Sequence, residues 1–428
     1  MSIVTASICP VRLTLNAIFR GQGLRSFAMG RRDLPQCDAG LLPLHRRLSL
    51  RFILWRKSLL ITSNSINLLV LVNDTPHGVM GLRARHLTSH LPSSFQVEIL
   101  YREAGKLTEF RRFCRKISEC PPDLIYVMNV GYVGGGAALL AKGLYGIPFV
   151  LDHGDPSYEL LRSSGRPLWE SVLVWFAEWI MLETAAAVVA RGASLTESLR
   201  SVRPEGVYFL PDGVDTERFR VLDVTDLRCE LGLDDALVIG VIGSIVWSNR
   251  YSMCYGWDII ETINRLKHRP VKGLIVGDGT GLPYLKERAK QYGIEDRICF
   301  TGRVPHEDVP QYINLMDVCL STQTNDSVGH GRTAAKLPEY LACGRFIIAT
   351  DVGGAREVVA ENGFLLPYSG VYDPEHPARL AERVEWLLDH PDALKQGLQG
   401  VAIARRKFEY QHLARSLSAL FDWVKQLS

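Results

Sequence analysis

Apolar runs of strand length alternate along this chain with amphipathic stretches of helix length. The first run, INLLVLVND from Ile66, is continuously apolar, as in a strand of a parallel sheet that helices cover on both faces. Further strands are predicted at Gln96–Tyr101 and within PPDLIYVMNV, IPFVLDHGD, AAVVA and VYFLP, with helices between them. Regular alternation of this kind predicts a parallel sheet with crossover helices.

A polar, turn-rich segment, PDGVDTERF at Pro211–Phe219, separates this series from a second one. The second series begins with a buried strand at Ala236–Val246 and continues with an amphipathic helix at Trp257–Lys267. Its later strands lie within VKGLIVGDG, RICFTGRV and VCLSTQT. Two series of this length predict two Rossmann-like domains that face each other across a cleft, with ligands at the carboxyl ends of the strands.

These patterns divide the chain into four parts. They are a basic N-terminal extension (1–64), an N-terminal Rossmann-like domain (65–212), a C-terminal Rossmann-like domain (213–408) and a C-terminal helical segment (409–428). The longest apolar stretch, Ser171–Ala190, contains Glu178 and Glu183. We therefore predict that it forms a buried helix that runs into a strand and does not span a membrane.

Composition narrows the class of protein. A chain of 428 residues with 47% hydrophobic residues can bury two large cores. The nine cysteines follow no paired spacing, which predicts reduced thiols in a cytosolic protein. The net charge of +3 is uneven, because the extension carries ten Lys/Arg against two Asp/Glu. The remainder is acidic overall and has no basic stripe, so nucleic acid is excluded as a partner.

The extension admits three interpretations. Its Arg-rich, acid-poor composition, as in RRLSLRFILWRKSLL, is typical of an organelle transit peptide. It is also compatible with a basic amphipathic surface that rests on anionic lipid. We favour the third interpretation, a flexible or spurious extension upstream of the folded domain, because no amphipathic period persists through its Pro and Gly residues.

The segment Thr322–Gly363 carries the clearest chemistry. A predicted loop of small residues, Gly329–Gly331, precedes Arg332 and a helix that opens around Lys336. Free amides in such a loop, the positive end of the helix and the two cations favour an anion. Glu339 lies just inside the helix, within reach of hydroxyls on the molecule that carries the anion. A ligand with both phosphate and several hydroxyl groups would satisfy these residues, and a nucleotide sugar is such a ligand.

A second candidate group ends the strand in IPFVLDHGD. His153 and Asp155 would lie at the predicted cleft, where they could contact a donor sugar or orient an acceptor hydroxyl. The alternative is a histidine that caps the next turn. The sequence offers no Asp-x-Asp motif in the second half, and His86 and His90 lack a third ligand, so no metal site is predicted.

From about Ile66 to its end, the chain resembles the retaining nucleotide-sugar glycosyltransferases of the GT-B fold (glycosyl transferases group 1, family 4-like). The matching motifs are the turn HGVMG, the strand-end IPFVLDHGD, the linker PDGVDTERF, GDG at Gly277–Gly279, FTGRV at Phe300–Val304, and KLPEYLACG with the following ATDVGG and NGFLLP. The resemblance implies an α/β fold of two Rossmann-like domains, of which the first binds the acceptor and the second the donor. It also implies that the last helix packs on the first domain.

The resemblance implies roles for individual residues. Gly78 is expected to approach the donor phosphates, and His153 to lie near the transferring sugar. Val304 is expected beside the base, and Glu339 is expected to bind the ribose. The amides around Thr333–Leu337, including those of Thr333 and Leu337, are expected to cradle the diphosphate.

The chain departs from the family pattern at three positions. Gly331 stands where the family usually has the first of two Glu residues. Ser244 and Tyr255 stand where it usually has an Arg and a Lys on the diphosphate. The cations available to replace that pair are Arg250, Arg332 and Lys336.

The expected function is retaining, metal-independent transfer of a hexosyl group from a nucleoside-diphosphate sugar to a saccharide or lipid-linked acceptor, as in polysaccharide biosynthesis. No cofactor is expected, because the nucleotide sugar is a substrate. The alternatives are a catalytically degenerate nucleotide-sugar-binding relative and another GT-B enzyme, such as a nucleotide-sugar epimerase. We expect a cytoplasmic protein and keep, as a hypothesis, peripheral contact with the inner membrane surface through Arg102–Lys116 or the extension.

Overall fold

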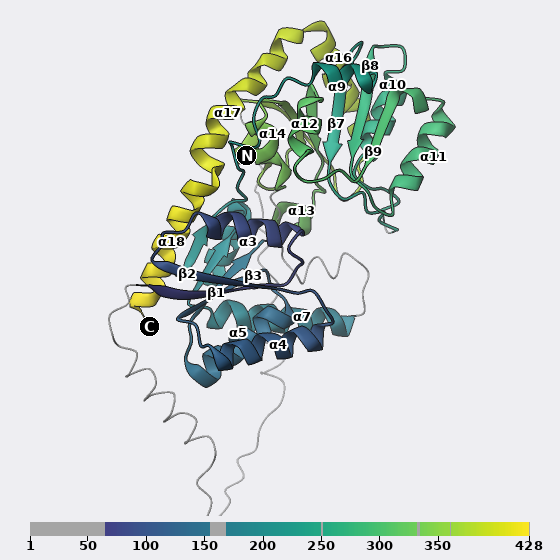
Figure 1. The fold of residues 1–428 in the computed structure, drawn as a ribbon. Helices are drawn as coiled ribbons and strands as arrows, with labels where there is room; N and C mark the ends of the chain where they lie inside the picture. The colour runs from purple at the N-terminus through teal and green to yellow at the C-terminus, as the bar shows by residue number, and fades with distance from the viewer. Residues whose placement is uncertain (1–64, 155–167, 250, 332–333, 360, 428) are drawn as a thin grey trace, which may run out of the picture. The chain divides into compact units, whose positions relative to one another are not determined.

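The structure is a computed structural model, and it describes residues 65–154, 168–249, 251–331, 334–359 and 361–427. Contacts within the chain divide it into residues 1–61 and 62–428. Two six-stranded parallel sheets lie in the second of these parts (Figure 1). The N-terminal extension lies outside the described residues, so its three interpretations stay open.

The first sheet has the strand order β2-β1-β3-β4-β5-β6, and every neighbouring pair is parallel. Its strands are β1 (Ile66–Val72), β2 (Phe95–Tyr101), β3 (Leu124–Met128), β4 (Phe149–His153), β5 (Ala187–Ala190) and β6 (Val207–Phe209). The helices between them are α3 (Val79–Ser89), α4 (Lys106–Glu119), α5 (Tyr132–Tyr145), α7 (Leu168–Thr184) and α8 (Ala193–Val202).

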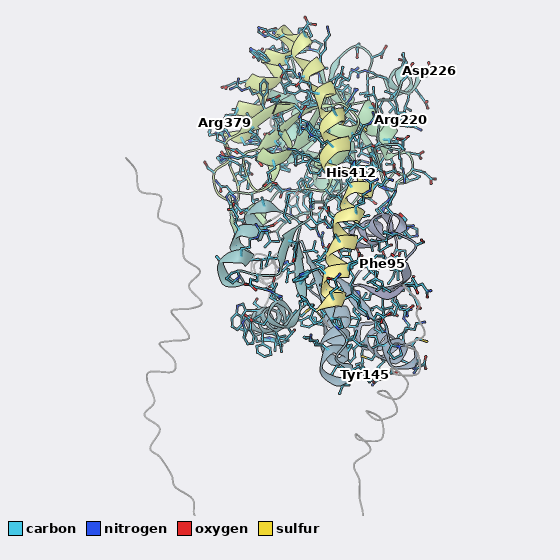
Figure 2. All side chains as sticks on the ribbon, turned by 90° about the vertical axis from the view of Figure 1, so that its left-hand side faces the viewer. Phe95, Tyr145, Arg220, Asp226, Arg379 and His412 are labelled. Carbon is cyan, nitrogen blue, oxygen red and sulfur yellow. The ribbon has the colours of Figure 1, made fainter. Side chains whose placement is uncertain are left out.

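Helices cover both faces of this sheet, which explains why its strands are apolar without alternation. Leu69 and Leu71 of β1 face a core built with α4, α5 and α7. Leu68 and Val70 face the opposite core, which α3 and the last helix, α18 (Tyr410–Gln426), complete. Figure 2 shows α18 along this sheet, where Phe95 packs against Phe421 with ring centroids 6.0 Å apart.

The second sheet has the order β12-β11-β10-β7-β8-β9 and is also entirely parallel. Its strands are β7 (Leu237–Ile242), β8 (Val271–Val276), β9 (Ile298–Gly302), β10 (Val318–Ser321), β11 (Phe346–Thr350) and β12 (Gly363–Leu366). The helices around it are α9 (Thr225–Glu230), α10 (Trp257–Arg265), α11 (Leu282–Tyr292), α12 (Val309–Asn314), α13 (Ser327–Gly331), α14 (Lys336–Ala342), α15 (Ala355–Val359), α16 (His376–Asp389) and α17 (Gln399–Ile403).

The predicted fold class is confirmed, since both sheets are parallel and doubly covered as the apolar runs indicated. One detail was wrong. The stretch Ser171–Ala190 forms α7 and β5 as predicted, but α7 is not a buried helix, because Leu173 and Phe176 on its outer side are exposed. No helix among the described residues is long and apolar enough to cross a membrane.

A buried ionic network ties the start of the linker to the first sheet. Asp152 at the end of β4 accepts from Arg83 of α3 at 3.1 Å and from Arg191 at 2.7 Å. Arg83 also donates to the backbone oxygens of Leu210 and Pro211 at 3.0 and 2.7 Å. Burial alone would raise the pKa of Asp152, but the two guanidinium groups hold it below its usual value. The linker therefore leaves the first sheet in a fixed direction.

Candidate functional site

The strand order of the second sheet defines where a ligand is expected. The chain moves outward from β7 to β8 and β9 on one side, and from β10 to β11 and β12 on the other. The crevice beside such a reversal, at the carboxyl ends of β7 and β10, is the usual ligand site of an open parallel sheet. The segments that follow these strands carry Ser244, Tyr255 and Lys336.

Lys336 at the start of α14 brings a cation to this place. Its Nζ is buried and has no hydrogen-bond partner among the described residues. It lies 4.2 Å from the centroid of the Tyr255 ring, a cation–π distance. Burial lowers the pKa of Lys336 to about 8, an effect that the charge of Glu339 partly opposes. A buried ammonium group without a partner is costly unless an anion joins it.

The turn after β7 leaves space beside Lys336 Nζ because it contains a glycine, Gly243. Gly243 follows β7 with φ +142°, and a Cβ placed on it would lie 3.3 Å from Lys336 Nζ. The backbone N–H of Ile242 donates to the Tyr340 hydroxyl at 3.1 Å, which fixes α14 against the end of β7. The end of β7 and the start of α14 therefore form one rigid unit around the ammonium group.

Glu339 lies one turn into α14, and its ionisation is also shifted. Burial raises the pKa of Glu339 to about 7, with Asp212 adding to the rise and Lys336 and Arg218 opposing it. A carboxyl group with this pKa changes its charge near neutral pH. As an acceptor for ligand hydroxyls it would work best in its ionised form.

The predicted loop at Gly329–Gly331 is wrong. These residues lie in the short helix α13. The N–H of Gly329 donates to the side-chain Oδ1 of Asp326 at 2.9 Å, and the N–H of His330 donates to the backbone oxygen of Asp326 at 3.0 Å. The first is a side-chain cap and the second a helical bond, so these two amides are not free for an anion. The sequence signal for this helix was the spacing of Asp326 ahead of the glycines.

The other predicted donor-site residues are placed as follows. Ser244 is exposed directly after β7, and Val304 is half-buried after β9. The side chain of Leu337 is buried in the core, and its N–H donates to the Ala334 oxygen at 2.9 Å. Gly331 is buried at the end of α13. Arg250, Arg332 and Thr333 lie outside the described residues, and so does Asp155.

Two aromatic residues in the segment after β7, Trp247 and Tyr255, have defined packing partners. Trp247 stacks on Tyr284 with ring centroids 4.0 Å apart. The Tyr255 hydroxyl accepts from Gln323 Nε2 at 3.1 Å, while its ring lies below Lys336 Nζ. Tyr255 thus connects the segment that follows β7 to the segment that follows β10.

In the first sheet, His153 is the last residue of β4 and is almost fully buried. Its Nε2 lies 2.7 Å from Glu178 Oε1 of α7, and both side chains are almost fully buried. Its Nδ1 has no hydrogen-bond partner among the described residues. Sequence analysis missed Glu178 as a partner, because the two residues meet only after α7 packs against β4.

Gly78 caps the start of α3 without room for a side chain. A Cβ there would lie 2.0 Å from Asp74 Oδ2. The same oxygen accepts from the Met80 N–H at 3.3 Å, so a carboxylate already faces this helix start. The predicted approach of Gly78 to the donor phosphates stays a prediction.

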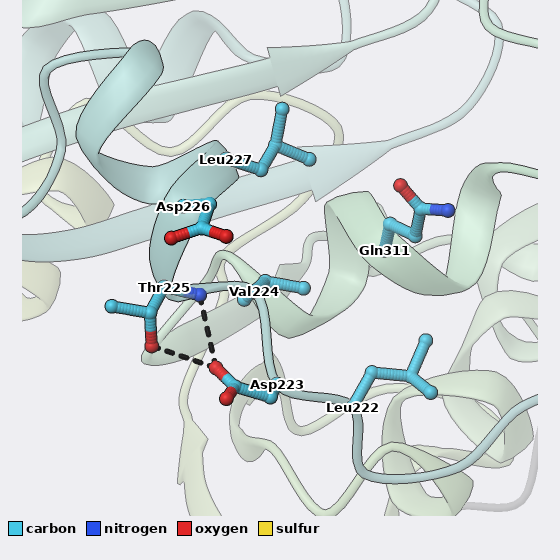
Figure 3. A pocket seen from close by; sticks show the side chains of 7 residues that line it. All are labelled: Leu222, Asp223, Val224, Thr225, Asp226, Leu227 and Gln311. Carbon is cyan, nitrogen blue, oxygen red and sulfur yellow. Dashed lines mark hydrogen bonds between the residues drawn. The ribbon is translucent and has the colours of Figure 1, made fainter.

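A surface pocket lies near α9 and α12, away from the candidate site. It has a volume of about 420 Å³ and is lined by Leu222–Leu227 and Gln311 (Figure 3). Asp223 accepts from the Thr225 N–H at 3.1 Å and from its hydroxyl at 2.7 Å, which closes a turn just before α9. None of the predicted site residues lines this pocket.

Comparison with known proteins supports the class that the sheets define. The crystal structure of Anabaena HepE in complex with UDP and glucose matches with a TM-score of 0.66 and 19% identity, covering 83% of this chain and 99% of that one. At this identity the match establishes the fold. The protein thus has the GT-B fold of two Rossmann-like domains.

Sequence matches to known proteins cover parts of the chain. Residues 236–390 match the family model described as glycosyl transferases group 1. The lipopolysaccharide core biosynthesis mannosyltransferase LpsB of Rhizobium meliloti is 29% identical over 223 residues, which cover 49% of this chain and 59% of that protein. A GDP-mannose-dependent phosphatidylinositol monomannoside mannosyltransferase of Mycobacterium tuberculosis is 28% identical over 259 residues, covering 56% of this chain and 65% of that protein. Residues 236–390 are thus similar to the glycosyl transferases of group 1, and the chain spans less than two thirds of the length of each of these two relatives.

Proposed function

We propose that the protein transfers a sugar from a nucleoside-diphosphate sugar to a saccharide or lipid-linked acceptor. The observation that carries this proposal is the buried Nζ of Lys336, which lies beside the glycine turn at Gly243 and has no hydrogen-bond partner among the described residues. A diphosphate in the crevice beside β7 and β10 would supply the missing partner. The names of the relatives, which include mannosyltransferases for lipopolysaccharide and a phosphatidylinositol mannoside, support this choice of acceptor class.

The charge of Lys336 suits the chemistry of sugar transfer. As the glycosidic bond breaks, negative charge grows on the departing nucleoside diphosphate and positive charge on the anomeric carbon. A fixed ammonium group at the diphosphate stabilises the transition state more than the ground state, because the charge it faces is larger there. Lys336 takes the place of the cations that Ser244 and Tyr255 do not provide.

The remaining roles complete the proposal. Glu339 accepts hydrogen bonds from the ribose, and His153 orients the transferring sugar or the acceptor hydroxyl. We propose retention of anomeric configuration by analogy with the family that the chain resembles. We propose metal independence because Lys336 and the start of α14 can neutralise the leaving group without a divalent ion.

A donor screen tests the function. UDP-, GDP- and ADP-sugars are incubated with saccharide and lipid-linked acceptors in the presence of EDTA, and released nucleoside diphosphate is measured. We expect turnover with one donor. Lys336→Met should lower kcat/KM by roughly 100-fold or more, because one stabilising charge at the transition state is lost. Glu339→Ala should mainly raise KM for the donor.

Two exposed residues provide matched controls. Lys290→Met on α11 and Glu382→Ala on α16 remove the same side chains elsewhere and should leave turnover unchanged. Tight nucleotide binding without release under any acceptor would favour the catalytically degenerate relative. Failure of all three nucleoside diphosphates to bind would contradict both functions.

A further inference from the structure

The helix α7 presents its more apolar side outward. Ser171 and Glu178, which are only 2% and 8% exposed, lie on its inner side with Val174 and Met181. Its outer side carries exposed Trp169, Val172, Leu173, Phe176 and Trp179. The two tryptophans are 63% and 46% exposed. A surface helix of a globular protein normally turns its apolar side to the core and its polar side to solvent. The exposed apolar side of α7 therefore indicates an interaction surface.

The helices α5 and α4 extend this apolar surface. A Cβ on Gly135 of α5 would lie 2.3 Å from Met181 Sδ of α7, and one on Gly136 would lie 3.1 Å from the Phe110 ring of α4. These glycines let the three helices form one continuous layer, which Figure 1 shows on one face of the first sheet. We call its outer surface the outer helical face. Its exposed large apolar residues are Leu107, Tyr132, Leu140, Leu144, Trp169, Val172, Leu173, Phe176 and Trp179.

Cations border this face on α4 and α5. Lys106, Arg111 and Arg115 of α4 and Lys142 of α5 are exposed. Arg111 and Arg115 form no ion pair with any described residue, whereas Arg112 and Lys116 on the same helix pair with Glu109 and Glu98. The acidic residues near the face are Glu170 and Glu183 on α7 and Glu119 at the end of α4.

We propose that the outer helical face docks on the surface of a bilayer that contains anionic lipid. Exposed Trp, Phe and Leu side chains bury their rings and chains at the boundary of headgroups and acyl chains. The exposed Arg111, Arg115, Lys106 and Lys142 at the edge of the same layer attract anionic headgroups. The cations point to lipid as the occupant, since a second copy of this face would bring them together. This docking goes beyond sugar transfer and does not require it.

Vesicle flotation with the full chain tests the proposal. The probes are vesicles of phosphatidylcholine alone and of phosphatidylcholine mixed with phosphatidylglycerol. We expect the protein to float with the mixed vesicles and to bind the neutral ones much more weakly. Leu173→Glu with Phe176→Glu should reduce binding to the mixed vesicles at least tenfold. Arg111→Glu with Arg115→Glu should reduce it by roughly tenfold or more at low salt.

Controls use the same changes on another part of the chain. Leu398→Glu and the pair Arg405→Glu with Arg406→Glu alter exposed residues outside this face and should leave vesicle binding unchanged. Unchanged thermal unfolding of the α7 double variant shows that the loss is not one of folding. If that variant unfolds early, Val172→Ser with Phe176→Ser is used in its place.

Three results would overturn the proposal. The first is no binding of the wild type to anionic vesicles. The second is equal binding of the wild type and the α7 variants, which would assign the attraction to another part of the chain, such as the basic residues 1–64. The third is a wild-type dimer that the α7 variants convert to monomer in light scattering, which would assign the face to a second copy.

Discussion

At the scale of single residues, Lys336 and Glu339 carry opposite pKa shifts within one turn of α14. Burial lowers the pKa of the ammonium group to about 8 and raises that of the carboxyl group to about 7. Their mutual attraction opposes both shifts without cancelling them. Between these two values both groups are largely ionised, which is the state that the proposed binding of a nucleoside diphosphate requires.

The pKa of Lys336 predicts a pH dependence of nucleotide binding. As pH rises through about 8, the free protein loses the ammonium proton on which the proposed contact with the diphosphate depends. Affinity for the nucleoside diphosphate should then fall by about tenfold per pH unit, and binding should take up protons from the buffer. Calorimetry in buffers of different ionisation enthalpy measures both effects.

The matched variant is Lys336→Met, which should bind more weakly and lose this alkaline decline. Titration of the nucleotide itself is common to both proteins and cancels in the comparison. An identical decline in the variant would show that another group sets the pH dependence.

At the scale of elements, close backbone contacts position the turns around the candidate site. Gly277, directly after β8, has φ +138°, and a Cβ on it would lie 1.9 Å from the Gly243 oxygen. The N–H of Gly243 in turn donates to the Val276 oxygen at 3.0 Å. The turns after β7 and β8 therefore hold each other, and the GDG motif is structural at its first glycine.

Gly277→Ala should destabilise the protein by about 2 to 5 kcal/mol, because it adds both backbone strain and a steric clash. Gly293→Ala, at the end of α11, is the control, since Gly293 has φ +62° but nothing within 4 Å of an added Cβ. That variant should cost only about 1 to 2 kcal/mol. Urea unfolding measures both, and equal losses would rule out the clash at Gly243.

At the scale of the whole molecule, the last helix completes the core of the first sheet. Phe421 of α18 is fully buried and contacts Phe95 and Tyr126, with ring centroids 6.0 and 5.2 Å away. Near the start of α18, Glu409 accepts from the Thr216 N–H at 3.1 Å and pairs as a bridge with Val214. The linker and the C-terminal segment are therefore joined, and α18 packs on the first sheet, as the family resemblance implied for the last helix. The exact division at residues 212 and 213 stays a prediction.

Phe421→Ala should destabilise the protein by about 3 to 5 kcal/mol, because it leaves a cavity between α18 and the first sheet. Leu427→Ala, an exposed position at the end of the same helix, should change stability by less than about 0.5 kcal/mol. Urea unfolding followed by far-UV circular dichroism gives both values. A small loss for Phe421→Ala would mean that α18 contributes little to this core.

The sequence by itself determined the two parallel sheets and the order of strands and helices along the chain, and it predicted the segment around Lys336 as the main candidate site. These depend on local properties, because a buried strand must be apolar and a helix must alternate its faces. The tertiary structure decided which side chains meet: Lys336 with Tyr255, His153 with Glu178, and Asp326 with the amides expected to be free. It also decided that the apolar side of α7 faces outward. Such outcomes depend on strand order and helix packing between distant segments, which no local pattern encodes.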